Sequence, residues 1–253
     1  MNRIRVIPVL LLKNGGLYKT VRFSEPKYVG DPINAVRIFN EKEVDELVLL
    51  DIWASRSIRN PDYKHIIEIT SEAFMPVAYG GGIKTLDQAK ELLYNGVEKV
   101  VINSSAVQKP SLITEIATRF GSQCVVVSVD VKKNFWGNYN VFWGNGKTNT
   151  GKNPKEYAKE FENLGAGEIL LNSIDRDGTY AGYDIELVKS VTSLLNIPVI
   201  VCGGAGSIHD FSKVVKEGGA SAVAAGSMFV FQRPHRAVLI SYPTQSELKS
   251  IIK

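Results

Sequence analysis

The chain has 253 residues, of which 44% are hydrophobic and 22% are charged, and its formal net charge is +4 at pH 7. This length and composition suit one large globular domain with a substantial core. The charge is mild and is spread along the chain, so we expect no nucleic-acid partner. No apolar run approaches the roughly 20 residues that cross a bilayer, and the start lacks a signal-peptide pattern, so we expect a cytoplasmic protein without a membrane partner.

Short apolar strands alternate with helical patterns along the whole chain. Helix starts are indicated by Asp31-Pro32 and by the capping-box pattern from Thr85 to Gln88. The strands are expected at residues 4–12, 46–51, 77–79, 98–102, 123–130, 168–172, 198–202 and 221–225. The helices are expected near 32–43, 62–74, 85–95, 110–120, 153–164, 184–195, 207–217 and 227–232. Eight such units at this length predict an α/β fold, the (β/α)₈ TIM barrel, with a doubly wound open sheet as the alternative.

An internal repeat favours the barrel over the open sheet. The glycine turn at 80–82 is followed one helix later by Asn103-Ser104, and the turn at 203–206 is followed one helix later by Gly226-Ser227. The two copies are offset by 122–123 residues. The repeat predicts two fused half-barrels, about residues 1–121 and 122–253, which close into a single domain over 1–253.

The central strand ends in a carboxylate. The apolar run from Cys124 to Val129 leads directly into Asp130, and in the matching N-terminal strand Leu11 stands at the equivalent position. Barrels of this kind carry catalytic groups at the carboxyl ends of their strands, so we predict a catalytic or substrate-binding role for Asp130. A structural aspartate that caps a neighbouring loop is the alternative.

The glycine-rich turns predict phosphate binding. Glycine lets backbone N–H groups approach a phosphate closely, and two such turns related by the repeat would lie on opposite sides of the mouth. They would hold a long substrate with a phosphate at each end, whereas the alternative is a pair of ordinary tight turns. Asp177 and Gly178, which follow the sixth strand, are interpreted as further phosphate-loop backbone.

Other features are less specific. The three histidines are not spaced with other ligands, and no motif of a covalent nucleophile is present, so we expect neither a metal nor a cofactor. Residues 133–150 form an aromatic, glycine-rich excursion that could be a hairpin, a lid or a docking surface. Charged residues at strand starts are Arg5, Glu46, Lys99 and Glu168. Alone they suggest solvated strand ends, and a ring across the bottom of the barrel is the alternative.

As a set, the motifs resemble the cyclase subunit of imidazole glycerol phosphate synthase over essentially the whole chain. The stretches that carry the resemblance include Gly30-Asp-Pro, Asp45-Glu-Leu-Val-Leu-Leu-Asp51, Gly80-Gly-Gly-Ile, Pro110-Ser-Leu-Ile, Phe120-Gly-Ser-Gln, Gly165-Ala-Gly-Glu-Ile-Leu-Leu, Ser173-Ile-Asp-Arg-Asp-Gly-Thr and Gly203-Gly-Ala-Gly. The resemblance implies a half-barrel-symmetric (β/α)₈ barrel with a glutaminase partner on its amino-terminal face. It implies that ammonia crosses the barrel to a ribulosyl carboxamide with two phosphates, giving imidazole glycerol phosphate and AICAR.

The resemblance also implies roles for individual residues. One phosphate site would use Gly82, Asn103 and Ser104, and the other would use Asp177, Gly178, Gly204, Gly226 and Ser227. Further active-site positions would be Lys19 and Asp51, one of two catalytic aspartates would be Asp130, and the ammonia gate would consist of Arg5, Glu46, Lys99 and Glu168.

Four positions depart from the family pattern. Leu11 falls on the family's other catalytic aspartate, and a leucine cannot transfer a proton. Val9, Asn172 and Cys202 replace the cysteine, threonine and serine that are usual in the family. The scaffold, phosphate sites and gate would therefore be kept, while half of the acid–base pair is lost.

This pattern resembles the paralogues that are encoded with surface-polysaccharide genes. In these, a glutaminase–barrel pair supplies ammonia to a sugar amidotransferase, which converts an acetamido group into an acetamidino group. The tail at 229–243 and the opening Val9-Leu-Leu-Leu-Lys13 fit that subgroup. Three alternatives stay open: a genuine cyclase of histidine biosynthesis, a non-catalytic ammonia conduit, and a sugar-phosphate isomerase, against which the four gate positions argue.

Overall fold

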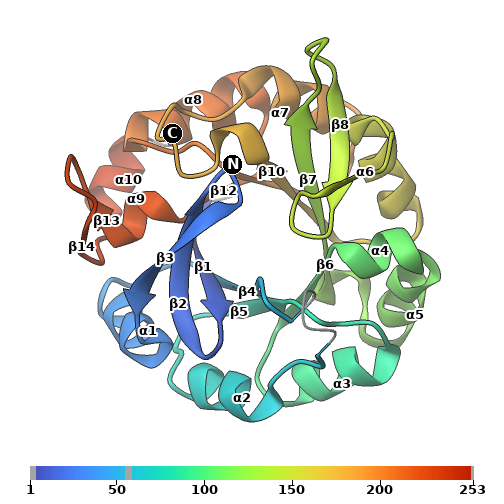
Figure 1. Ribbon diagram of the computed structural model, residues 1–253, viewed down its shortest axis with the longest axis horizontal. Coiled ribbons are helices and arrows are strands. Elements are labelled where there is room, and N and C mark those ends of the chain that lie inside the picture. The colour runs from blue at the N-terminus through green and yellow to red at the C-terminus, as the bar shows by residue number, and fades with distance from the viewer. Residues whose placement is uncertain (1–3, 55–58, 252–253) are drawn as a thin grey trace.

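Eight parallel strands close into a barrel surrounded by helices in the computed structural model, which describes residues 4–54 and 59–251 (Figure 1). The barrel strands are β1 (Arg5–Lys13), β4 (Leu47–Asp51), β5 (Val77–Gly80), β6 (Lys99–Ile102), β7 (Val125–Lys133), β10 (Glu168–Ser173), β11 (Val199–Cys202) and β12 (Ala222–Ala225). They pair in this order, and β12 pairs back with β1. The predicted (β/α)₈ barrel is confirmed, and the open sheet is excluded because no barrel strand is left at an edge.

Eight helices in the described parts of the chain begin and end close to the predicted positions, whereas the short helix α4 and the helix α10 were not predicted. In chain order the helices are α1 (Pro32–Glu41), α2 (Tyr63–Ser71), α3 (Leu86–Tyr94), α4 (Ser104–Gln108), α5 (Ser111–Phe120), α6 (Pro154–Asn163), α7 (Ile185–Thr192), α8 (Ile208–Gly218), α9 (Ser227–Val230) and α10 (Gln245–Ile251). Asp31 caps α1 by accepting a hydrogen bond from the Asn34 N–H at 2.9 Å. Thr85 and Gln88 form the predicted capping box at α3. No helix in the described parts of the chain is long and apolar enough to cross a membrane.

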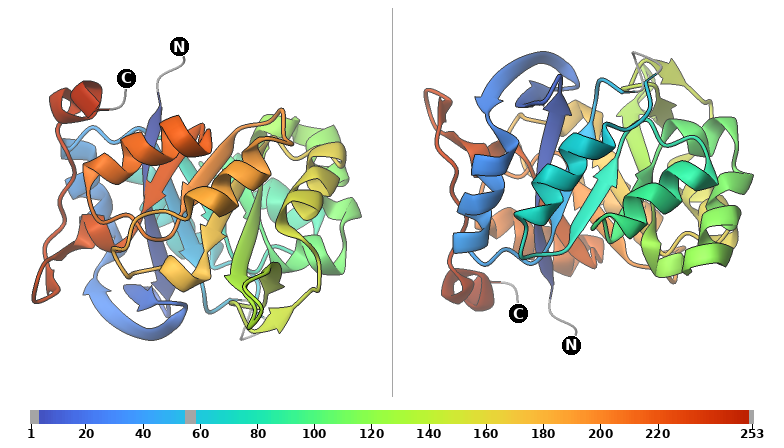
Figure 2. Two further views of the ribbon diagram at one scale, coloured as in Figure 1. Left: turned by 90° about the horizontal axis from the view of Figure 1, so that it is seen from above. Right: turned by 90° about the horizontal axis from the view of Figure 1, so that it is seen from below.

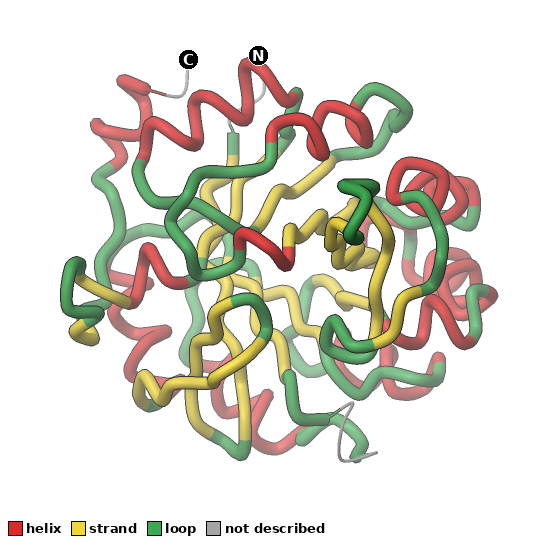
Figure 3. The backbone as a smooth tube through the Cα atoms, turned by 45° about the horizontal axis from the view of Figure 1, so that its top comes forward, coloured by secondary structure: helices red, strands yellow, loops and turns green. Residues whose placement is uncertain are grey.

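Several short strands add to the eight predicted ones, and only those at 133–150, where a hairpin was one of the interpretations, were anticipated. The added strands are β2 (Gly16–Val21), β3 (Ser24–Gly30), β8 (Tyr139–Trp143), β9 (Thr148–Asn149), β13 (Phe231–Gln232) and β14 (Ala237–Val238). The β2–β3 and β8 hairpins project from one end of the barrel, while the start of β1 and helix α10 lie toward the other end (Figure 2). Figure 3 shows the same hairpins over the carboxyl ends of the barrel strands. They therefore enlarge the rim at the end where such barrels carry their functional groups.

The core has two layers. An outer cluster lies between the barrel and the helices and contains large buried rings such as Phe39, Phe161 and Phe211. An inner cluster fills the barrel with small and medium side chains, including Ile7, Val48, Ala78, Val126, Leu170, Ile200 and Ala222. Because side chains alternate along a strand, Arg5 at the bottom of β1 and Leu11 near its top share the inner face with Ile7. The inner layer therefore separates two polar ends of one barrel.

Candidate functional site

A cavity of about 500 Å³ lies at the carboxyl ends of the barrel strands. The residues singled out from the sequence that line it include Leu11, Lys19, Asp51, Gly82, Asn103, Ser104, Asp130, Asp177 and Gly226, together with the unusual residues Val9, Asn172 and Cys202. The structure thus brings together side chains from both predicted half-barrels. Gly178, Gly204 and Ser227 do not line this cavity but lie in the turns beside it, as described below.

Asp130 is the buried carboxylate of the mouth. Its Oδ2 accepts a hydrogen bond from Asn103 Nδ2 at 3.2 Å, and its Oδ1 accepts one from Ser128 Oγ at 3.3 Å. Burial raises the pKa of Asp130 from 3.8 to about 7, and the nearby charge of Asp177 acts in the same direction. A carboxyl group with a pKa near neutrality can both accept and return a proton, which is what a general acid–base group requires.

Leu11 faces the same cavity from the opposite side of the barrel. Strand β7 is four places from β1 in the ring of eight, so the ends of the two strands lie across the mouth from each other. Leu11 pairs with Leu50 on β4, and both side chains pack against the apolar inner cluster. The mouth therefore has one wall with a carboxylate and one apolar wall.

The β2–β3 hairpin carries a buried lysine into the mouth. Lys19 donates a hydrogen bond to the Val9 carbonyl oxygen, and burial lowers the pKa of Lys19 to about 8 while the charge of Asp177 opposes that change. Asp177 is held by Thr20 Oγ1, which donates to its carboxylate at 3.0 Å. A Cβ at Gly226 would collide with Lys19 Nζ, so glycine is needed there for the lysine to pass. Thr20 was missed by the sequence analysis because its partner is 157 residues away.

Asp51 does not point a free carboxylate at the mouth. Its Oδ1 accepts hydrogen bonds from the N–H groups of Trp53 at 2.8 Å and Ala54 at 2.9 Å. Burial raises the pKa of Asp51, and these two hydrogen bonds oppose the rise. Its geometry is that of a carboxylate that orders the loop after β4 at the edge of the cavity.

The two glycine turns lie on opposite sides of the mouth. Gly82 follows β5 and Gly204 follows β11, and these two strands are four places apart in the ring of eight. The φ angle is +72° at Gly82 and +115° at Gly204. Gly178 has a φ of +69° and packs so closely on the Thr20 carbonyl that a Cβ would lie 2.5 Å from its oxygen. Within residues 4–54 and 59–251, the N–H groups of Gly82, Gly178 and Gly204 have no hydrogen-bond partner. Such N–H groups are the donors that an anion would use.

The excursion at 133–150 is a hairpin whose turn lines the mouth. Strand β8 pairs antiparallel with β7, and Trp143, Gly144 and Asn145 border the cavity. Asn145 Nδ2 donates to the Ile52 carbonyl at 2.9 Å, which joins this turn to the loop after β4. The sequence analysis left the role of this segment open, and the pattern Trp-Gly-Asn-Gly was the signal of a tight turn that could have placed these residues.

Two of the unusual residues, Asn172 on β10 and Cys202 on β11, lie at the same level of the barrel as Asp130 on β7. Asn172 pairs in register with both Asp130 and Cys202. The Asn172 side-chain oxygen is buried and has no hydrogen-bond partner. Burial raises the pKa of Cys202 to about 12, so its thiol stays protonated and is a poor nucleophile. Among the described residues, no group of three His, Cys, Asp or Glu side chains could hold a metal ion.

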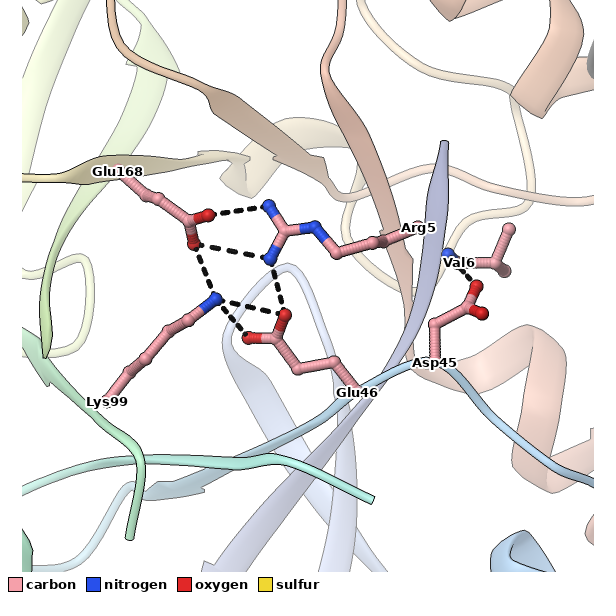
Figure 4. Close-up of polar contacts among 6 residues, drawn as sticks. All are labelled: Arg5, Val6, Asp45, Glu46, Lys99 and Glu168. Carbon is pink, nitrogen blue, oxygen red and sulfur yellow. Dashed lines mark hydrogen bonds and ion pairs between the residues drawn. The ribbon is translucent and has the colours of Figure 1, made fainter. Parts of the chain in front are cut away.

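At the other end of the barrel, four charges form a closed ring (Figure 4). Arg5 contacts Glu46 at 2.5 Å and Glu168 at 2.6 Å, and Lys99 contacts each of these glutamates at 3.1 Å. The Glu46 side chain is only 3% exposed. The side chains therefore converge across the barrel bottom and are not separate solvated strand ends. Their role as a gate stays a prediction.

The raised pKa of Asp130 makes a prediction about stability. Between pH 4 and about 7 the folded chain binds more protons at this carboxyl than the unfolded chain does, so its contribution to stability falls as pH rises through this window. We therefore expect Asp130→Asn to be more stable than the unchanged chain at pH 8, by roughly 2–4 kcal/mol, and the difference to vanish below pH 4. Urea unfolding at both pH values measures it, and equal stabilities at pH 8 would contradict a raised pKa.

The fold and the mouth define a (β/α)₈-barrel protein with its functional groups at the carboxyl ends of the strands. Residues 5–234 match the family described as histidine biosynthesis protein. The chain belongs to this family, among the HisF-type cyclase subunits of imidazole glycerol phosphate synthase.

Relatives match the chain over nearly its whole length. A Pseudomonas aeruginosa protein provisionally named imidazole glycerol phosphate synthase subunit hisF2 is 58% identical, over 98% of this chain and 99% of its own length. A Vibrio vulnificus protein provisionally named subunit hisF3 is 50% identical, over 100% of this chain and 98% of its own. The imidazole glycerol phosphate synthase subunit HisF of Alkaliphilus metalliredigens is 44% identical, over 89% of each chain.

Proposed function

We propose that the chain is the synthase subunit of a glutamine amidotransferase. It receives ammonia through its barrel from a glutaminase subunit and delivers it to a phosphorylated small molecule in the mouth. The observation that carries this proposal is that the same barrel has two different polar ends. One end holds a closed ring of four charges, and the other holds a buried carboxylate between two glycine turns. The names of the relatives, each a subunit of a synthase, support it.

The ring at the barrel bottom is suited to control entry. It contains two cations and two anions, so it carries no net charge that would hold an ammonium ion. The apolar inner layer above it favours neutral ammonia over ammonium because an unpaired charge is costly to bury. Ammonia that passes an opened ring would thus reach the mouth unprotonated, which is the form that attacks carbon.

Chemistry in the mouth would depend on Asp130. With a pKa near 7, its carboxylate can take a proton from an attacking ammonia nitrogen and return it to a departing group. The N–H groups of Gly82 on one side and of Gly178 and Gly204 on the other would hold phosphates at the two ends of the acceptor. Lys19 adds a positive charge beside the second turn.

The leucine at position 11 favours an ammonia acceptor other than the ribulosyl carboxamide. The standard cyclisation uses two aspartates, and the apolar wall formed by Leu11 and Leu50 offers no second carboxylate. We therefore propose that the chain is a paralogue that supplies ammonia for amidination of a surface-polysaccharide sugar, with a sugar amidotransferase as a further partner. The numbered names hisF2 and hisF3 of two close relatives support a role as an additional copy.

Two other functions rest on specific observations. The glycine turns and Asp130 favour a genuine cyclase of histidine biosynthesis, because they match a substrate with two phosphates and one of the two catalytic aspartates. The loss of the second aspartate favours a non-catalytic ammonia conduit. The closed ring favours all three ammonia-linked functions over a sugar-phosphate isomerase, which has no use for it.

Phosphate binding tests the acceptor half of the proposal. We expect Gly204→Ala to weaken binding of inorganic phosphate by about tenfold or more, since the new Cβ would collide with the Gly182 carbonyl and φ is +115°. Gly137→Ala is the matched control, because Gly137 has a φ of +81° but nothing within 4 Å of its Cβ position. Calorimetric titration measures both. Equal affinities in the two variants would count against a phosphate site at this turn.

A further inference from the structure

The hairpin formed by β13 and β14 carries a group of basic side chains to the rim of the barrel. Its turn contains Arg233, His235 and Arg236, and it lies beside β3 at the edge of the molecule (Figure 1). The match to the family model ends at residue 234, inside the turn of this hairpin, so Arg236 and β14 lie outside the matched segment. The second half of the hairpin is therefore not part of what the family model describes.

Arg233 contacts the second glycine turn, at residues 203–206, through a hydrogen bond. Its Nη2 donates to the Gly206 carbonyl at 2.7 Å, two residues after Gly204, and its guanidinium lies 5.0 Å above the ring of Tyr180. Tyr180 in turn donates its hydroxyl hydrogen to the Ser227 carbonyl at 3.3 Å. The hairpin is thus joined to the turns that would hold the second phosphate.

Arg236 lies at the other end of the hairpin's turn, directly before β14. Its guanidinium is 4.9 Å from the ring of Phe231, and Lys27 Nζ is 5.2 Å from the same ring. Lys27 also donates to the Arg236 carbonyl at 3.0 Å. Burial raises the pKa of Asp177, and the charges of Lys19 and Arg236 oppose that rise, which places Arg236 within electrostatic reach of the mouth.

Among the described residues, the cations at this rim form no direct ion pair, although the charge of Arg236 acts on the Asp177 carboxylate. Within residues 4–54 and 59–251, no carboxylate forms an ion pair with Arg22, Lys27, Arg233 or Arg236. The Nε of Arg236 is buried without a hydrogen-bond partner. Like charges held close together repel each other, and a buried unpaired donor is costly, so an anion bound here would reduce both costs.

We propose that the β13–β14 hairpin is part of the second phosphate site, and that Arg233 and Arg236 select a phosphate monoester in its doubly ionised form at that end of the acceptor. Arginine suits this role because its planar fork of donors matches phosphate oxygens two at a time. This inference rests on the proposed function, since it adds specificity-determining residues to the same site. The hairpin supplies charge, while the glycine turns supply backbone N–H groups.

Amide shifts in ¹H–¹⁵N spectra can follow each phosphate site separately during titration with inorganic phosphate at pH 7.5. Gly82 and Ser104 report on the first site, whereas Gly178 and Gly204 report on the second. In the double variant Arg233→Gln/Arg236→Gln we expect the midpoint for Gly178 and Gly204 to rise about tenfold or more, and the midpoint for Gly82 to stay unchanged. Arg119→Gln on α5, which removes a positive charge from another part of the surface, is the control and should change neither.

The outcomes separate the two proposals. Unchanged midpoints at Gly178 and Gly204 in the double variant would overturn the role of the hairpin while leaving the phosphate site in place. An absence of shifts at both sites in the unchanged chain would overturn the phosphate-bearing acceptor itself, and the hairpin role with it. Preserved Gly82 shifts in the variant show that the barrel is folded. Arg233→Lys/Arg236→Lys, which keeps the charges but loses the forks, should fall between the unchanged chain and the glutamine variant.

Discussion

Leu11→Asp is expected to raise ammonia-dependent turnover of the ribulosyl carboxamide substrate by about 10²–10⁴-fold, the usual contribution of one general acid–base group. Leu11 lies across the mouth from Asp130 and lines the same cavity, so a carboxylate there would stand on the far side of a bound acceptor. The unchanged chain should show feeble turnover or none. An assay with free ammonium and no glutaminase measures the chemistry of the mouth alone.

Two control variants test whether the gain in turnover comes from the second carboxyl group. Leu11→Asn has nearly the shape of the aspartate variant but cannot exchange a proton, so it should give no gain. Adding Asp130→Asn to Leu11→Asp should remove the gain, because both groups are then required. Turnover by the unchanged chain at the rates of the histidine-pathway enzymes would show that Leu11 is no obstacle to the standard reaction.

Glu46→Gln is expected to lower the free energy of unfolding by about 3 kcal/mol, since it leaves two partly buried cations with one carboxylate between them. Glu46 contacts both Arg5 and Lys99, and its side chain is almost completely buried. The loss should be smaller in a chain that also carries Lys99→Met, because that change removes one of the stranded charges. Urea unfolding at pH 7 measures both variants.

Glu72→Gln is a matched control for this prediction. Glu72 pairs with Arg37 at 2.9 Å on the surface, where both side chains are well exposed. Exposed ion pairs contribute little to stability, so this change should have a much smaller effect than Glu46→Gln. Equal losses in the two variants would mean that the ring at the barrel bottom is no more than a set of surface pairs.

The barrel could be predicted from the sequence because each of its units carries a local signal. Apolar runs, capping residues such as Asp31 and Thr85, and turn glycines all act within a few residues of themselves. The β2–β3 hairpin could not, since most of β3 is exposed and the turn lies at Arg22 and Phe23, which have positive φ without being glycine. Such turns have no reliable signature in the sequence.

The site could be predicted where it lies at strand ends. Asp130, Gly82 and Gly204 follow from the rule that barrels carry their groups there. Contacts between distant segments could not be predicted, for example the hydrogen bond from Asn145 to Ile52. The ring at the barrel bottom was expected only through the family resemblance, because its four charges come from segments far apart in the sequence and meet only when the barrel closes. Their individual contexts suggest solvated ends.

The central claim is that this barrel takes ammonia from a glutaminase subunit. Sedimentation of the purified chain, mixed in turn with each glutaminase subunit of its own cell, tests that claim most directly. The expected result is a one-to-one complex with one of them at micromolar concentrations. A chain that sediments alone in every mixture, under conditions in which histidine-pathway complexes stay associated, would contradict it.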